Sequence, residues 1–169
     1  MDAAELRALQ DPIKERYKSD PSAAVITLKA KGSIENEGIA CKVETGRALA
    51  VAGLHPATGG SGLELCSGDM LLEALVACAG VTLKSVATAI DVPLKVGNVI
   101  AEGDLDFRGT LGVDKEAPVG FAEIRLRFEV ATDAPQDKLD LLLKLTERYC
   151  VVYQTIRNGP KVSVSMKRI

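Results

Sequence analysis

The sequence contains no tryptophan, and aromatic residues make up only 4% of its 169 residues. It therefore lacks the aromatic platforms on which single-stranded nucleic acids stack. Its 21 Lys and Arg residues are balanced by 23 Asp and Glu residues, which leaves no excess of positive charge to hold a phosphate backbone. We expect no nucleic-acid partner and a core built from aliphatic side chains.

The pattern of a secretory or membrane-spanning segment is missing as well. Residues 1–17 have no basic start, apolar stretch or small-residue cleavage site. The most apolar segment, residues 70–83, is interrupted by Glu73, and its longest uncharged run of ten residues is half a membrane span. We expect a cytoplasmic protein with no membrane partner, in which this segment forms a buried helix.

Motifs for metal and nucleotide binding are also absent. The four cysteines are separated by 25, 12 and 72 positions, whereas zinc ligands are normally paired a few residues apart. No Gly-x-Gly-x-x-Gly, Walker or Gly-x-Ser-x-Gly motif is present. A cysteine hydrolase would need the only histidine, His55, close to a cysteine, but its place beside Pro56 favours an exposed loop residue. We expect neither a metal nor a cofactor.

Hydrophobic periodicity predicts the elements of the N-terminal part. Apolar residues at helical spacing favour a short amphipathic helix over residues 3–18, interrupted by Pro12 and followed by a turn. Alternating residues favour two strands, at 26–31 and 39–43, that form a hairpin with its turn at 32–38. A third short strand is expected at 47–51, and a long loop follows at 53–68. Long loops in compact domains are often functional.

The central helix is the most distinctive element. Ser67 is a suitable N-cap and Asp69 suits the first turn, so the helix is predicted to run from there to about Ile90. Its residues are apolar nearly all round, which predicts that sheet or another subunit covers most of its sides.

Strands and a second long helix are predicted in the C-terminal half. Strands are expected at 94–109 and 121–130, and the second alternates strictly between apolar and charged residues. Asp133 and Gln136 have the spacing of a capping box for a helix that ends close to Cys150. A turn at 158–160 and a last strand at 162–166 complete an α+β chain with segregated elements. We divide it into an N-terminal helix and turn (1–22) and a single domain (23–169).

The cysteines are the main candidates for chemistry. Cys78 lies in the most apolar helix, where a free cysteine is usually a small core residue. A reactive thiolate there would need a cation from elsewhere in the fold, and Arg47 is the first candidate. Cys150 falls at a helix end, where a packing role is again the simpler interpretation. Cys41 lies on an apolar strand face and reads as structural, and Cys66 lies in the long loop.

Two segments together resemble the cysteine signatures of the OsmC/Ohr family, the osmotically inducible and organic hydroperoxide resistance proteins. They are SGDMLLEALVACAGVTL at 67–83 and ERYCVVYQTIRNG at 147–159. In that family a first cysteine lies in a central apolar helix and a second follows some 60 to 75 residues later at a helix end; here the separation is 72. The resemblance extends over residues 25–169.

The resemblance implies an OsmC-like fold, with antiparallel sheets wrapped around two long central helices in an intertwined homodimer. It also implies a cysteine-based peroxidase that reduces organic hydroperoxides to alcohols. Cys78 would be the thiolate that is oxidised to a sulfenic acid, and Cys150 would condense with it to a disulfide. An external dithiol would then reduce the disulfide, without a cofactor or metal.

Several positions differ from the family pattern. Val151 replaces a common proline after the second cysteine, and Tyr153 replaces a small residue. Peroxidase members pair an arginine with the thiolate and hold it with a glutamate at the start of the central helix, where this chain has Asp69. Glu73 stands where alanine is commoner, and it lies about 140° around the helix from Cys78, so it should not face the thiol of its own helix. An ion pair at the surface or at a subunit interface is the simpler role for Glu73, and an arginine or the partner subunit is the alternative neighbour.

The arginine that would activate Cys78 is left open among Arg47, Arg16 and Arg108, with Arg47 in the most suitable region. The function is also left open between two classes. The leading hypothesis is a thiol peroxidase, because both cysteines are retained. The alternative is an OsmC-like small-molecule or redox-responsive binding protein with little or no peroxidase turnover, which the changed neighbourhood of Cys150 favours.

Overall fold

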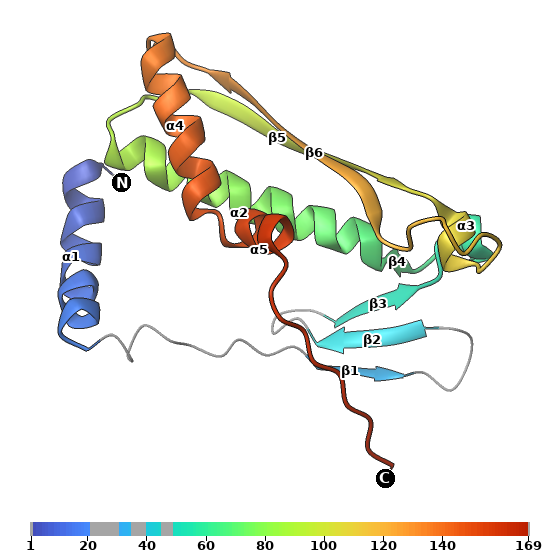
Figure 1. Cartoon of the computed structure of the whole chain (residues 1–169). Coiled ribbons are helices and arrows are strands. Elements are labelled where there is room, and N and C mark those ends of the chain that lie inside the picture. Colours follow the sequence, from blue (N-terminus) through green and yellow to red (C-terminus); the bar gives the residue numbers. More distant parts are fainter. Residues whose placement is uncertain (1, 21–30, 35–39, 45–48, 169) are drawn as a thin grey trace.

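The computed structural model describes residues 2–20, 31–34, 40–44 and 49–168. A long central helix packs against a two-stranded sheet and against two C-terminal helices that lie beside it, and a second sheet lies near its start (Figure 1). The elements in chain order are α1 Ala3–Ser19, β1 Lys31–Ile34, β2 Ala40–Glu44, β3 Leu49–Gly53, the 3-10 turn η2 Pro56–Thr58, β4 Leu65–Cys66, α2 Ser67–Ala89, β5 Val96–Leu105, α3 Phe107–Thr110, β6 Phe121–Ala131, α4 Gln136–Tyr149 and α5 Val151–Asn158.

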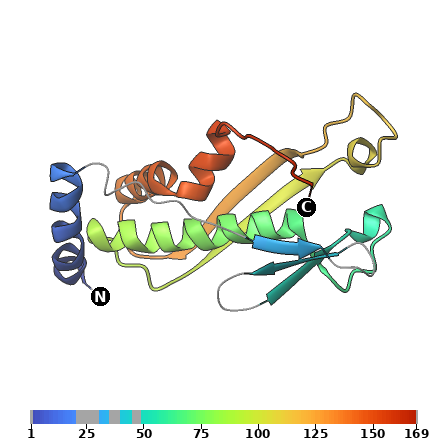
Figure 2. The ribbon, with the colours of Figure 1, turned by 90° about the horizontal axis from the view of Figure 1, so that it is seen from below.

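The N-terminal helix α1 is confirmed, but it is not interrupted. Asp2 caps it, accepting hydrogen bonds of 2.8 Å from the backbone N–H groups of Ala4 and Glu5. The helix continues through Pro12 to Ser19. In Figures 1 and 2, α1 stands beside the C-terminal end of α2 and not against the sheets.

The first sheet has the order β1-β2-β3-β4. β1, β2 and β3 pair antiparallel, and β3 pairs with β4 in parallel. The predicted second and third strands are confirmed within two residues. The predicted first strand at 26–31 lies outside the described residues except for Lys31, the first residue of β1. The predicted turn at 32–38 is wrong in its first part, because Gly32 pairs with Val43 and Ile34 with Cys41 inside the β1–β2 ladder.

The central helix α2 matches its predicted length, and Asp69 lies in its first turn as expected. Ser67 is not the N-cap: Cys66 occupies that position with extended backbone, and Ser67 is the first helical residue. The chain reaches Cys66 through the parallel pairing of β4 with β3, which fixes the helix start one residue earlier than the capping signal suggests.

The second sheet is the antiparallel pair β5–β6, which runs along α2 (Figure 2). β6 confirms the alternating segment. The predicted strand at 94–109 is too long, because the Asp106 carboxylate accepts a hydrogen bond of 3.0 Å from the Arg108 N–H and starts the short helix α3.

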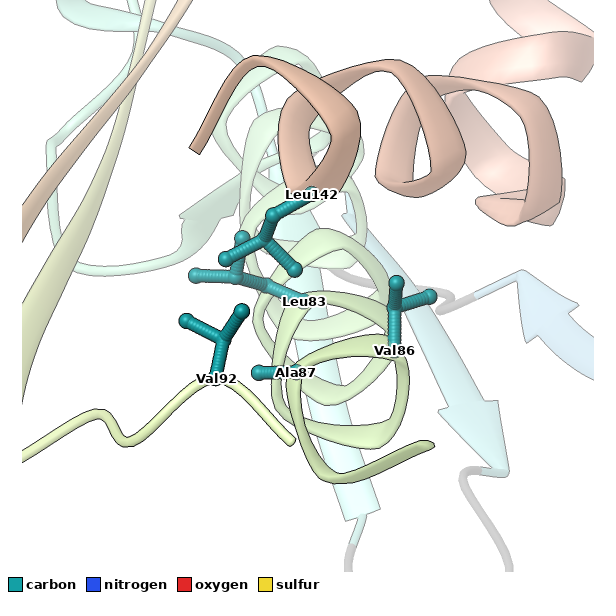
Figure 3. Packing of buried hydrophobic residues seen from close by; sticks show 5 residues of the cluster. All are labelled: Leu83, Val86, Ala87, Val92 and Leu142. Carbon is teal, nitrogen blue, oxygen red and sulfur yellow. The ribbon is translucent and has the colours of Figure 1, made fainter. Parts of the chain in front are cut away.

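The core lies where α2 and α4 cross over the end of the second sheet. Its buried residues are Leu83, Val86, Ala87, Val92 and Leu142 (Figure 3), and Phe128 and Val130 of β6 pack against them. The capping box predicted for α4 is wrong: Pro135 is the N-cap and makes no side-chain cap bond. Asp133 instead forms an ion pair with Lys95, just before β5.

The C-terminal segment differs most from its prediction. α4 ends at Tyr149 as expected, but a further helix, α5, begins at Val151. Residues 162–166 form no strand, and their apolar side chains are almost fully exposed, Val164 at 93% and Met166 at 99%. The alternating pattern is present, but within the described part of the chain it pairs with no strand.

The apolar composition of α2 predicts that most of its surface is covered, but the described residues of one chain cover only part of it. Leu75, Ala79 and Leu83 are buried, whereas Val81 is 73% exposed. By length and composition alone, α2 is also the one helix among the described residues that could cross a membrane. Its covered face belongs to the core described above, so the exposed face is what needs a partner.

Candidate functional site

The structure brings Cys78 and Cys150 together. Cys78 lies midway along α2 and is partly buried, and Cys150 is the residue between α4 and α5, with only 1% of its surface exposed. Both are free thiols. Two cysteines 72 positions apart in the sequence therefore face each other across the contact between α2 and the start of α5.

The break between α4 and α5 creates the polar part of this site. Cys150 has extended backbone, with φ −72° and ψ 108°, and caps the start of α5. The first N–H groups of any helix have no partner inside it. Here the N–H groups of Val151 and Val152 are directed at the thiol of Cys78.

These contacts set the acidity of Cys78. Burial alone would raise the pKa of its thiol, because it disfavours the thiolate. Hydrogen bonds from the Val152 N–H, the Cys150 thiol and the Val151 N–H outweigh burial, and the pKa of Cys78 is lowered below its ordinary value. The thiolate is the nucleophilic form of cysteine, so this environment favours a reactive Cys78.

The acidity of Cys150 changes in the opposite direction. Burial is the largest cause and raises the pKa of its thiol. The hydrogen bond from the Tyr153 N–H comes next and lowers it, but the neighbouring Cys78 raises it again, and the net shift is upward. Cys150 therefore remains a protonated thiol that can donate its hydrogen bond to the Cys78 thiolate. When the environments of two neighbouring titratable groups shift their pKa values in opposite directions, the two groups often have different roles in one reaction.

Thr82 also lies near Cys78, one turn further along α2. Its hydroxyl group donates a hydrogen bond of 2.8 Å to the Cys78 carbonyl oxygen. A hydroxyl has a single proton, which it can donate either to that carbonyl or to the thiol, and its contribution to the lowered pKa of Cys78 is the smallest of the hydrogen bonds. The backbone N–H groups of α5 and the Cys150 thiol are therefore the main stabilising groups.

None of the other predicted site residues that the structure describes is among the groups that act on the Cys78 thiol. Arg47 lies outside the described residues. Asp69 and Glu73 are exposed on α2. Arg16 is exposed on α1, and Arg108 forms ion pairs with Asp106 at 2.6 Å and Asp114 at 3.3 Å.

His55 is not the exposed loop residue that the sequence suggested. It is partly buried, its ring stacks on Phe107 with centroids 4.9 Å apart, and its Nδ1 accepts a hydrogen bond of 3.0 Å from the Ala57 N–H. His55 lines a cavity of about 350 Å³ at the start of α2, together with Cys66 and Asp69. Among the described residues, no cluster of three or more His, Cys, Asp or Glu side chains could hold a metal ion.

Two larger cavities flank the cysteine pair. One, of about 490 Å³, lies between α2, β6 and α5 and is lined by Leu75, Tyr153 and Arg157 among others. The other, of about 650 Å³, is lined by Thr82, which is one turn from Cys78, and by Tyr149, which precedes Cys150. Cys78 and Cys150 line neither cavity, and Cys150 is almost fully covered within one chain.

Sequence reasoning missed the backbone donors of Val151 and Val152. A signal for one of them is present in the sequence, because a valine follows the second cysteine where many OsmC/Ohr proteins carry a proline. Proline has no N–H group, so Val151 offers a donor that those proteins lack.

The family of the chain follows from its sequence. Residues 60–165 match the family described as OsmC-like protein, which covers more than half of the chain and both cysteines of the site. The chain belongs to this family. No curated protein matches the sequence.

Solved structures show the same fold. An OsmC-like protein from Mycoplasma pneumoniae superposes with a TM-score of 0.65 at 14% identity, covering 79% of this chain and 89% of that one. Organic hydroperoxide resistance proteins from Legionella pneumophila and Elizabethkingia anophelis give TM-scores of 0.61 and 0.62 at 17% and 14% identity. These matches cover 80% of this chain and 92% and 91% of the other two. At such identities the comparison shows the fold alone.

Proposed function

We propose that this chain is a thiol-dependent peroxidase that reduces organic hydroperoxides to alcohols. The observation that supports it most strongly is the placement of the Cys78 thiol against the free N–H groups of α5, beside the buried thiol of Cys150. Two of the structurally similar proteins are named for organic hydroperoxide resistance, which agrees with this proposal.

The reaction proceeds in two steps. The Cys78 thiolate attacks the outer oxygen of the hydroperoxide, the O–O bond breaks, and the alkoxide leaves and takes up a proton to become the alcohol. Cys78 is oxidised to a sulfenic acid. The Cys150 sulfur then attacks the sulfur of Cys78, which releases water and forms a disulfide, and an external dithiol reduces that disulfide to two thiols.

The different acidities of the two cysteines suit these roles. The thiol that reacts first has the lowered pKa, and its neighbour keeps its proton until the sulfenic acid forms. The proton of Cys150 is then available to the departing hydroxide of the sulfenic acid. A reducing compartment such as the cytoplasm, which we propose for this chain, would supply the dithiol.

A second function is favoured by one observation. The groups that lower the pKa of Cys78 are neutral hydrogen-bond donors, and no cationic side chain of the described residues is among them. A neighbouring cation is one of the features that lower the pKa of reactive cysteines, and the described residues supply none to Cys78. An OsmC-like protein that binds a small molecule or senses redox state, with little turnover, fits that weaker activation. Arg47 remains our candidate for the missing cation, and Asp69 and Glu73 for the carboxylates that would orient it.

We further propose that two copies form an intertwined homodimer. The exposed face of α2, with Val81 at its centre, needs an apolar partner. The unpaired segment at 162–166 has the alternating pattern of a strand and would find its partner on a second copy. A dimer of this kind would explain why α2 is apolar on all sides and why residues 162–166 have the sequence pattern of a strand but form none in one chain.

The function is tested by multiple-turnover reduction of cumene hydroperoxide with a dithiol reductant. Wild type should turn over, Cys78→Ser should be inactive, and Cys150→Ser should accumulate a sulfenic acid that a dimedone probe traps. If Cys150→Ser turned over like wild type without trapped sulfenic acid, the resolving role would be wrong. If wild type itself showed no reduction, the binding-protein function would replace the peroxidase.

A further inference from the structure

The break between α4 and α5 contains no residue that breaks helices. Residues 136–158 include neither proline nor glycine, so the sequence alone would permit one continuous helix across Cys150. In the structure the two helices run in different directions, because Cys150 has extended backbone (Figure 1). A break without proline or glycine usually has a side chain or a water inserted into the hydrogen-bond ladder of the helix.

Gln154 supplies such a side chain. Its amide nitrogen donates a hydrogen bond of 2.7 Å to the carbonyl oxygen of Glu147, in the last turn of α4. In a continuous helix the Val151 N–H would donate to this carbonyl, because each N–H binds the carbonyl four residues earlier. The Val151 N–H is directed at the Cys78 thiol instead. A side-chain donor therefore replaces a backbone donor at Glu147, and the backbone donor becomes available to Cys78.

Two further hydrogen bonds hold Gln154 in this position. Its amide oxygen accepts a hydrogen bond of 2.8 Å from the side chain of Asn158, one turn further along α5. Its backbone N–H donates to the Cys150 carbonyl oxygen at 2.9 Å, in the first turn of α5. Gln154 is partly buried. It therefore ties the start of α5 to the end of α4 across Cys150.

We propose that Gln154 is a positioning residue for Cys78: by occupying the Glu147 carbonyl, it keeps the helix broken and directs the Val151 N–H to the thiol. Gln154 is not among the groups that act on either thiol, so its effect passes through the backbone. This inference rests on the proposed function, in which the Cys78 thiolate is the nucleophile, and adds the residue that prepares it.

The test measures how fast iodoacetamide labels the Cys78 peptide between pH 5 and 10, in reduced protein and without peroxide. Gln154→Met keeps a side chain of similar length but removes the donor. The Val151 N–H can then return to Glu147, so the labelling profile of Cys78 should move to higher pH. Labelling at pH 7 should slow about fivefold, as for the loss of one hydrogen bond. An unchanged profile would overturn the inference.

Gln136→Met is the matched control. Gln136 is the first residue of α4, and its amide also donates a hydrogen bond of 2.7 Å, to the carboxylate of Asp140. The same substitution there removes a similar hydrogen bond fourteen residues before Cys150, so Cys78 should be labelled as in wild type. Equal slowing in the two methionine variants would show a general loss of stability and would overturn the positioning role.

Val151→Pro shows whether Gln154 acts through the Val151 N–H. Proline at this position removes that N–H and enforces the break by itself. Gln154 then has no N–H group to direct, so the variant with both substitutions should label Cys78 no more slowly than Val151→Pro alone. Independent effects would multiply. A double variant about fivefold slower than Val151→Pro would therefore contradict the route through Val151.

The failure of this inference and that of the proposed function are distinguishable, because the labelling experiment needs no peroxide. If Gln154→Met moves the labelling profile but wild type does not reduce cumene hydroperoxide, the peroxidase function fails and the positioning role stands. If wild type reduces cumene hydroperoxide and Gln154→Met is labelled like wild type, the function stands and the positioning role is overturned.

Discussion

The thiol of Cys150 donates a hydrogen bond to Cys78, and the same contact has opposite effects on the two residues. It helps to lower the pKa of Cys78 and to raise that of Cys150. Cys150 also stands one residue before the N–H groups that face Cys78. The break between α4 and α5 therefore brings both the Cys150 thiol and the backbone N–H donors next to Cys78.

The two thiols should ionise in separate pH ranges. Because the pKa of Cys78 is lowered and that of Cys150 is raised, iodoacetamide should alkylate Cys78 at a lower pH than an ordinary thiol, whose pKa is about 8.5, and Cys150 at a higher one. The measurement is the labelling rate of each cysteine-containing peptide from pH 5 to 10. Equal pH profiles for the two would contradict the assignment.

The same shift has a consequence for stability. A group whose pKa is lowered on folding stabilises the folded state above its unfolded pKa and loses that contribution as the pH falls through its folded pKa. The contribution of Cys78 should therefore disappear on acidification, and Cys78→Ser should remove that part of the pH dependence in urea unfolding.

Val151 offers a direct test of the backbone donors. Proline is well accepted in the first turn of a helix, and Cys150 already has the extended backbone that precedes proline, so Val151→Pro should keep α5 intact while removing one N–H group. We expect the pKa of Cys78 to rise and its reaction with peroxide at neutral pH to slow about tenfold, as for the loss of one hydrogen bond to a charged group. Stopped-flow peroxide consumption measures it.

Val151→Ala is the control for this experiment, because it keeps the N–H group and changes only a side chain that is 69% exposed. It should behave like wild type. If Val151→Pro and Val151→Ala reacted equally fast, the N–H of Val151 would have no role in activating Cys78.

The exposed face of α2 should be a contact between copies. Val81→Asp places a charge in that face and should convert a dimer into a monomer of 17.9 kDa in sedimentation equilibrium, because burying an unpaired carboxylate costs several kcal/mol. Val113 is also 73% exposed but lies in the turn after α3, so Val113→Asp should leave the mass unchanged. A monomeric wild type would contradict the proposed dimer.

Leu142 should dominate the packing of α4 on α2. It is 2% exposed inside the core cluster, and Leu142→Ala should reduce the free energy of unfolding by about 2–5 kcal/mol through the cavity it leaves. The neighbouring Leu141 is 42% exposed, and Leu141→Ala should cost less than about 1 kcal/mol. Urea unfolding of both variants measures the difference. Equal losses of unfolding free energy in the two variants would contradict the central role of Leu142 in the core.

The elements with strong periodicity were predictable from the sequence. The length of α2 and the position of β6 follow from long apolar patterns that their own residues set. The caps were not predictable: Ser67 and Asp133 have good capping side chains, but the β3–β4 pairing and the Lys95–Asp133 ion pair place the chain differently. The strand pattern at 162–166 was present too, but a strand needs a neighbour, and residues 2–20, 31–34, 40–44 and 49–168 do not supply one.

The candidate site was half predictable. Cys78 and Cys150 were recognisable from the family resemblance, since spacing alone cannot show that residues 72 positions apart meet. The donors at Val151 and Val152 belong to the backbone, which every residue type except proline provides, so no side-chain pattern marks them. Asp69 and Glu73 share the helix of Cys78 but are exposed, because a helix of 23 residues presents its side chains in all directions.

The central claim is that Cys78 and Cys150 form a peroxide-reactive pair. Its most direct test is the intact mass of the reduced protein before and after one equivalent of cumene hydroperoxide, with peptide mapping, in wild type and in Cys78→Ser. We expect wild type to lose the mass of two hydrogen atoms and to gain a Cys78–Cys150 disulfide, and we expect neither change in the variant. An unchanged mass after minutes, or a disulfide that omits Cys78, would contradict it.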